Sequence, residues 1–228
     1  MSTLERDSRD AGSARELRLP GSGPSASLHG AGDTVVVLGH GAGGNRRNSL
    51  LLALAEALAG SGRAALLYNF PYSEAGSRRP DPPVVLEATT RAAAALALEA
   101  SGARYIVHGG RSMGGRIASQ VVAAGERANG LAFLGYPLHP PKQPERRREA
   151  HLPRIAAPML FLQGTRDTFA RGDLLDALMQ RLGSRAEIHR VQEADHSFGV
   201  LKRSGRTPKD VLAEVQTALL TWLDRHGL

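Results

Sequence analysis

The sequence predicts a single α/β domain with a mostly parallel central sheet and helices on both faces of that sheet. Two observations lead to this prediction. Between residues 34 and 225, short apolar runs that fit buried strands alternate with longer segments that fit helices. The length, 228 residues, suits one domain of this class rather than two.

Six apolar runs are predicted to be strands of the main sheet. The first, TVVVLG at 34–39, is apolar throughout, as expected of a strand that helices cover on both faces. The other predicted strands lie at 64–70, 105–109, 131–136, 158–163 and 186–191. Two weakly alternating segments precede them, at 15–20 and 25–29. Gly and Pro separate these two, and we predict a pair of short antiparallel strands.

Helices are predicted between the strands. They lie at 48–59, 84–100, 112–124, 173–182 and 208–225, the last with Trp222 on its apolar face. The stretch 137–158 is irregular and rich in Pro, Arg and Glu; segments of this length usually cover a site or lack order. We predict no large lid domain. Residues 1–14 are polar and charged and are predicted to be a disordered tail, so the domain spans 15–228.

Composition excludes several classes of protein. The chain has no cysteine, which removes disulfides, thiol nucleophiles and cysteine metal sites, and we expect neither a metal nor another cofactor. No run of 18 apolar residues is present, and residues 1–16 lack the apolar stretch of a secretory signal. We therefore expect a cytoplasmic protein with no membrane partner.

The net charge of +7 requires nucleic-acid binding to be considered. The arginines, however, are spread along the whole chain. The densest run, at 146–148, lies in the irregular stretch without interleaved aromatic residues. We predict no nucleic-acid partner, and the sequence does not indicate the oligomeric state.

A serine lies where a strand is predicted to turn sharply into a helix. Residues 110–114 read GRSMG and match G-x-S-x-G, directly after the strand at 105–109 and at the start of the helix at 112–124. Such a turn exposes the serine, and the helix N-terminus favours a developing oxyanion. We predict Ser112 to be a nucleophile; the simpler alternative is a serine that only caps the helix.

A glycine-rich turn follows the first buried strand. Residues 39–44 read GHGAGG, and backbone N–H groups there are free to face a ligand. We predict that the Ala42 and Met113 N–H groups form an oxyanion hole and that His40 stabilises the loop. The turn also fits the dinucleotide pattern G-x-G-x-x-G, but the next strand ends in YNF at 68–70 without the acidic residue that holds a ribose.

The acid and base are expected late in the chain, in the order Ser, acid, His. His196, in ADHSF just beyond the last strand, is the predicted base. Asp167, in QGTRD after the preceding strand, is the predicted acid; alone it could equally be an exposed turn residue. The adjacent Asp195 is expected to point away. Because the carboxyl ends of parallel strands share one sheet edge, the three groups are expected to meet there.

Several motifs together resemble a known family. LGHGAGG, NFPYSEAG, GGRSMGGR, GYPLHPP, QGTRD and DHSF are similar to those of small dienelactone-hydrolase-like α/β-hydrolases. Within that family, the chain most resembles the branch that contains the bacterial relatives of the testis-expressed and non-specific-lethal-complex hydrolase-like proteins. The resemblance covers about residues 15–226 and implies an α/β-hydrolase fold with a triad of Ser112, Asp167 and His196. Dienelactone hydrolases use a cysteine nucleophile, which this chain lacks, so their reaction is not implied.

These features favour a serine hydrolase that cleaves a small-molecule carboxylic ester or thioester. The alternatives are a peptidase with the same triad and a non-catalytic scaffold, because some members of this branch lack activity. Arg111 and His139 are predicted to bind substrate. With the arginines at 78–79 and 146–148, Arg111 would form a cationic rim that favours small or acidic acyl groups; a solvated charged face is the simpler interpretation.

Overall fold

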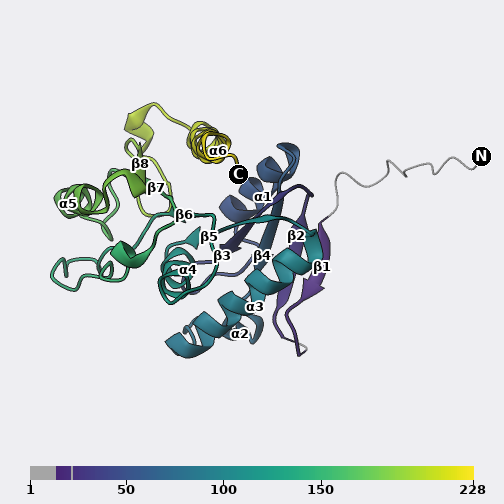
Figure 1. The fold of residues 1–228 in the computed structure, drawn as a ribbon. Coiled ribbons are helices and arrows are strands. Elements are labelled where there is room, and N and C mark those ends of the chain that lie inside the picture. Colours follow the sequence, from purple (N-terminus) through teal and green to yellow (C-terminus); the bar gives the residue numbers. More distant parts are fainter. Residues whose placement is uncertain (1–13, 22) are drawn as a thin grey trace, which may run out of the picture.

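The computed structural model describes residues 14–21 and 23–228 (Figure 1). Eight strands form one sheet in the order β1-β2-β4-β3-β5-β6-β7-β8. They are β1 (Arg15–Arg18), β2 (Ser25–His29), β3 (Thr34–Gly39), β4 (Ala64–Tyr68), β5 (Tyr105–Arg111), β6 (Gly130–Leu134), β7 (Met159–Gly164) and β8 (Ala186–Val191). β2 is antiparallel to β1 and to β4, and all other neighbours are parallel. The prediction of a mostly parallel sheet is confirmed.

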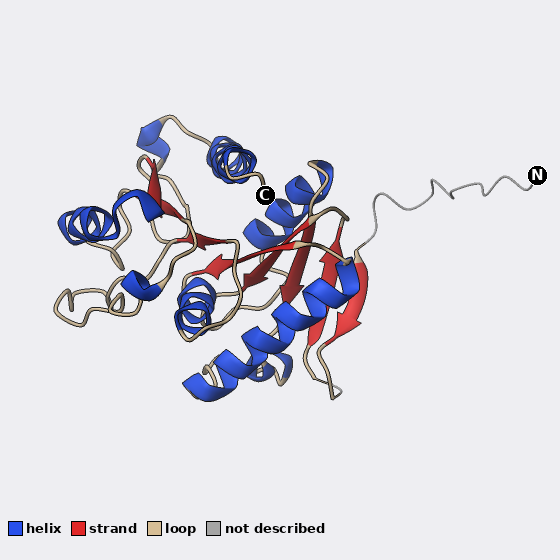
Figure 2. Cartoon of the chain, in the orientation of Figure 1, coloured by secondary structure: helices blue, strands red, loops and turns tan. Residues whose placement is uncertain are grey.

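Helices cover both faces of the sheet (Figure 2). They are α1 (Ser49–Gly60), α2 (Pro71–Glu74), α3 (Pro83–Ser101), α4 (Met113–Ala123), α5 (Gly172–Leu182) and α6 (Pro208–Arg225), with 3-10 turns η1 (Leu152–Arg154), η2 (Gly183–Arg185) and η3 (Lys202–Ser204). Buried side chains of α1 and α6 pack on one face, and those of α3, α4 and α5 pack on the other. None of the helices in the described part of the chain combines the length and apolar character needed to cross a membrane.

Side-chain caps mark the starts of two helices, α1 and α6. The Asn48 side chain accepts a hydrogen bond from the Leu51 N–H and begins α1. Thr207 and Asp210 form a reciprocal capping box at the start of α6. Trp222 of α6 is fully buried between helix and sheet, as its place on the apolar face predicts.

The structure corrects several predicted boundaries. The strand predicted at 131–136 occupies Gly130–Leu134, because Gly135 has φ of 69° and turns the chain out of the ladder. The helix predicted from residue 112 begins at Met113. The short helix α2 was not predicted, because four residues carry no helical period. The predicted tail at 1–14 lies outside the described residues except for Ala14.

The irregular stretch at 137–158 is ordered by its own anchors rather than forming a lid. Leu138 and Leu152 are fully buried in the core beside β6 and α5. The Tyr136 hydroxyl donates to the Arg148 carbonyl at 2.9 Å, and the Arg148 N–H donates to the Leu138 carbonyl at 2.9 Å. The stretch therefore packs along the flank of the domain.

Candidate active site

Ser112 occupies a strained turn between β5 and α4. Its φ of 49° and ψ of −112° lie outside the regions that side chains other than glycine ordinarily adopt. Although Ser112 stands at the helix N-cap position, its side chain makes no capping hydrogen bond. The capping alternative therefore does not describe this residue, and the hydroxyl is directed elsewhere.

Glycines on both sides make this turn sterically feasible. Gly110 has φ of 145°, and a β-carbon there would lie 2.3 Å from the Gly39 carbonyl oxygen. A β-carbon at Gly114 would lie 2.2 Å from the same oxygen. Real β-carbons do not approach backbone so closely, so the G-x-S-x-G spacing lets α4 dock directly on the end of β3.

The hydroxyl of Ser112 meets the imidazole of His196. Ser112 Oγ and His196 Nε2 are 2.8 Å apart, and His196 Nδ1 is 2.7 Å from Asp167 Oδ2. The three residues follow β5, β8 and β7, whose carboxyl ends share one edge of the sheet. The side chain of Asp167 is fully buried, whereas that of His196 is 15% exposed. The structure thus brings together the three residues that the sequence predicts as a triad.

Asp167 is fixed by more than the histidine. Its Oδ1 accepts the Phe169 N–H at 2.7 Å, and its Oδ2 also accepts Gln163 Nε2 at 2.5 Å. The amide oxygen of Gln163 accepts the Tyr136 N–H at 2.8 Å, so the orientation of this side chain is determined. Sequence reasoning missed Gln163. A buried amide at the end of the apolar run of β7 was the available signal.

The loop that carries His196 is held by its neighbours. Asp195 Oδ1 accepts the N–H groups of Ser197 and Gly199 at 2.8 and 2.9 Å, so this carboxylate points into its own loop, as expected. The ring of Phe169 stacks on the imidazole of His196, with centroids 4.1 Å apart and an angle of 27° between the planes. These contacts fix the imidazole in one orientation between Ser112 and Asp167.

The glycine-rich loop lies beside the serine. A β-carbon on Gly41 would be 3.7 Å from Ser112 Cβ. His40 is buried, and its ring bonds to the Gly41 carbonyl at 2.8 Å and to the Phe70 N–H at 3.1 Å, as expected of a residue that stabilises this loop. Ala42 is exposed at the surface of the loop, and Met113 is buried at the first position of α4. Their roles as oxyanion donors stay a prediction.

The two predicted substrate-binding residues have different surroundings. Arg111 Nη2 donates to Ser197 Oγ at 2.8 Å, and a β-carbon on Gly41 would lie 3.1 Å from Arg111 Nη1. Arg111 therefore bridges the glycine-rich loop at 39–44 and the loop that carries His196. His139 is buried, and both of its ring nitrogens form hydrogen bonds with backbone groups, the Pro140 carbonyl and the Arg171 N–H. Only its ring carbons would therefore be available to contact a substrate.

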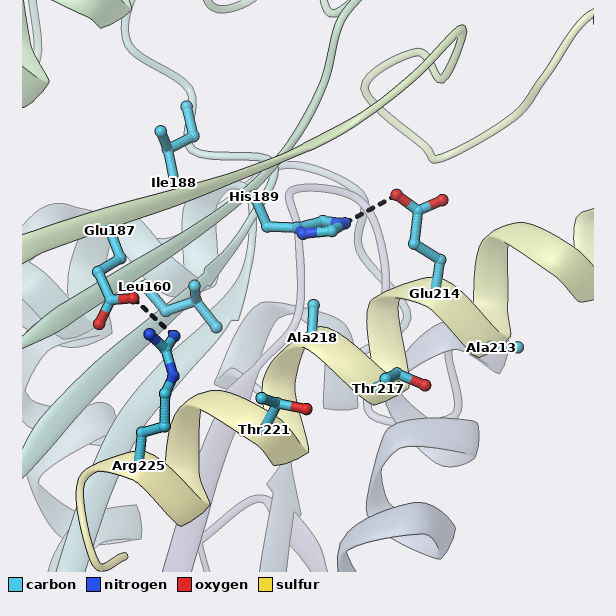
Figure 3. Close-up of a pocket in the computed structure, with 10 residues that line it drawn as sticks. All are labelled: Leu160, Glu187, Ile188, His189, Ala213, Glu214, Thr217, Ala218, Thr221 and Arg225. Atoms are coloured by element: carbon cyan, nitrogen blue, oxygen red, sulfur yellow. Dashed lines mark hydrogen bonds and ion pairs between the residues drawn. The ribbon is translucent and has the colours of Figure 1, made fainter.

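A hollow of about 520 Å³ lies away from this constellation, between β8 and α6 (Figure 3). The pairs His189–Glu214 and Glu187–Arg225 flank it, at 2.7 and 2.6 Å, and Leu160 contributes apolar surface. The hollow is not lined by Ser112, Asp167 or His196. Because its charged groups already pair with one another, we assign it no chemical role.

Comparison with known proteins identifies the family. A model of the alpha/beta hydrolase domain matches residues 32–224. The chain is an α/β-hydrolase. It shares the fold of a serine hydrolase homologue from Coxiella burnetii (TM-score 0.70, 19% identity, 92% of this chain and 97% of the other). It also matches a Xanthomonas campestris α/β serine hydrolase without a lid (TM-score 0.69, 17% identity, 92% and 94%).

A further solved structure shares this fold. The α/β-hydrolase matches a putative dienelactone hydrolase from Klebsiella pneumoniae with a TM-score of 0.70 and 21% identity, over 93% of this chain and 98% of the other. At such identities the likeness shows the fold alone, and the chemistry depends on the residues of this chain.

Proposed function

We propose that this α/β-hydrolase cleaves carboxylic esters or thioesters through an acyl-enzyme on Ser112. The observation that supports this most directly is the unbroken hydrogen-bond chain from the Ser112 hydroxyl through His196 to the buried Asp167. A serine hydroxyl is a weak nucleophile, and an adjacent imidazole held by a carboxylate is the arrangement that activates it.

In the first half-reaction, Ser112 Oγ attacks the acyl carbon as its proton passes to His196 Nε2. Asp167 holds the proton on Nδ1 and stabilises the imidazolium that forms. The N–H groups of Ala42 and Met113 stabilise the oxyanion. His196 then gives its proton to the departing alkoxide or thiolate, which leaves as an alcohol or thiol.

In the second half-reaction, water replaces the leaving group. His196 Nε2 removes a proton from the water, whose oxygen attacks the acyl carbon, and then returns that proton to Ser112 Oγ as the ester bond to the enzyme breaks. The products are a carboxylic acid and the free enzyme. Neither step requires a metal or another cofactor.

A panel of p-nitrophenyl esters and acyl thioesters of increasing chain length tests this proposal. The wild-type enzyme should hydrolyse at least one member, and Ser112→Ala should reduce that rate to the background. Binding of substrates without turnover by the wild type would favour the non-catalytic scaffold. Turnover confined to peptides would favour the peptidase.

The substrate is proposed to be a small, preferably acidic, acyl compound in the cytoplasm. Arg111 supports this because its half-buried guanidinium lies beside the nucleophile and bonds to a neutral hydroxyl of Ser197. Charged and neutral p-nitrophenyl esters should differ in KM, with the anionic esters binding better. Equal rates would remove the proposed preference and leave the arginines as a solvated face.

A further inference from the structure

The hydroxyl of Tyr72 lies under the glycine-rich loop. Tyr72 belongs to the short helix α2 and is only 4% exposed. Its ring stacks on Phe70 with centroids 6.3 Å apart and meets the His40 ring edge-on at 5.7 Å. This packing directs the hydroxyl to the Gly41 carbonyl oxygen, 3.3 Å away.

Three donors converge on the Gly41 carbonyl. The Gly44 N–H lies 3.1 Å from it, His40 Nδ1 2.8 Å and the Tyr72 hydroxyl 3.3 Å. The tautomer of His40 follows from its partners. Its Nε2 faces the Phe70 N–H and must accept, so the proton resides on Nδ1 and is donated to the Gly41 carbonyl, which can only accept. The side chains of His40 and Tyr72 thus act on one oxygen.

Fixing this oxygen fixes the neighbouring N–H. The peptide between Gly41 and Ala42 is planar and trans, so its N–H points opposite to its carbonyl. With the carbonyl turned inward to two buried side chains, the Ala42 N–H is turned to the other side of the loop. Donors on the carbonyl also polarise the peptide, which makes the N–H a stronger donor.

Glycines around this peptide allow it to rotate. Gly41 lacks the side chain that restricts ψ next to this peptide, and Gly43 and Gly44 allow the chain beyond Ala42 to adjust, with Gly43 already at φ of 70°. A rotated peptide would present its carbonyl oxygen to the developing oxyanion, and the two negatively polarised oxygens would repel each other. Preorganised donors are effective in catalysis because they need no reorientation during the reaction.

We infer that Tyr72 is a positioning residue whose hydroxyl holds the Gly41–Ala42 peptide in the orientation that aims the Ala42 N–H at the oxyanion; this rests on the proposed hydrolase function. The hydroxyl acts through the peptide because it is buried and engaged by the Gly41 carbonyl. Burial raises the pKa of the Tyr72 phenol, which therefore remains a donor over the working pH range.

The kinetic test removes only this hydroxyl. Tyr72→Phe keeps the ring that packs on Phe70 and His40. We expect kcat to fall about 10-fold, which is less than the loss of kcat when an oxyanion donor itself is removed. KM should stay within about twofold of the wild-type value. Affinity for a boronic acid that forms a tetrahedral adduct on the nucleophilic serine should fall by a similar factor.

Tyr68→Phe is the matched control. Tyr68 is equally buried, but its hydroxyl bonds to Thr90 Oγ1 at 3.0 Å, and this variant should retain the wild-type kcat. The inference is overturned if Tyr72→Phe retains kcat, if only KM changes, or if Tyr68→Phe loses as much.

A crystal structure of Tyr72→Phe gives a readout that needs no activity. We expect the peptide between Gly41 and Ala42 to be flipped or to occupy two orientations, while the wild-type enzyme shows one. A single, unchanged orientation in the variant would overturn the inference. Failure of the wild type to hydrolyse any ester would instead refute the proposed function, and the peptide orientation would still decide the role of Tyr72.

Discussion

The α-carbon of Gly114 packs so closely on β3 that a β-carbon would lie 2.2 Å from the Gly39 carbonyl oxygen. This approach joins the first turn of α4 to the strand that leads into the glycine-rich loop. It therefore sets the distance between Ser112 and that loop, and one added methyl group should disturb both stability and the site.

Gly114→Ala is expected to destabilise the protein by about 3 kcal/mol or more, because backbone on both sides must move. Gly60→Ala is the matched control. Gly60 ends α1, and a β-carbon there meets nothing within 4 Å, so alanine should be neutral or slightly stabilising. Urea unfolding of both variants gives the comparison. Similar stabilities for the two would show that the close packing at Gly114 is unimportant.

Asp167→Asn is expected to lower kcat roughly 10³-fold or more while the protein still folds. The asparagine oxygen can accept the Phe169 N–H, but its NH₂ group then faces His196 Nδ1 and favours the wrong tautomer. Asp195→Asn tests the neighbouring acid. The oxygen that accepts from Ser197 and Gly199 is retained there, so kcat should change no more than severalfold. The opposite ranking would assign the acid to Asp195.

The sequence was sufficient to predict the sheet, most helices and the meeting of Ser112, His196 and Asp167 at one sheet edge. Strand-sized apolar runs show where the strands follow one another along the chain. Because the carboxyl ends of parallel strands meet at one edge of the sheet, Ser112 and His196 could be predicted to lie close together although 84 positions separate them. The contact of Tyr72 could not be predicted, and that of Gln163 was indicated only by an amide at the end of an apolar run. Each acts through a contact set by tertiary packing, and α2 is too short to show a period.

Stability is expected to fall on acidification, partly through His108. This side chain is fully buried in β5; Nε2 bonds to the Arg127 carbonyl, and Nδ1 meets no partner among the described residues. Burial lowers the pKa of His108 from its ordinary value of 6.5 to about 4. Between these values the unfolded chain binds the proton and the folded chain does not, so stability is lost as pH falls through this range.

Urea unfolding at pH 7.5 and pH 5 measures this effect. At pH 5, His108 should account for about 2 kcal/mol of the decrease in the free energy of unfolding. His108→Gln should remove this contribution. His40 and His151, whose pKa values burial also lowers, should still contribute in the variant. A variant whose stability falls by as much as that of the wild type would contradict this assignment.

Labelling with a fluorophosphonate probe, followed by mass mapping of the adduct, tests the central claim that His196 activates Ser112. We predict a single adduct on the peptide that contains Ser112, with none on Ser112→Ala and strongly slowed labelling of His196→Ala. An unlabelled wild type, or an adduct that persists in Ser112→Ala, would contradict the account.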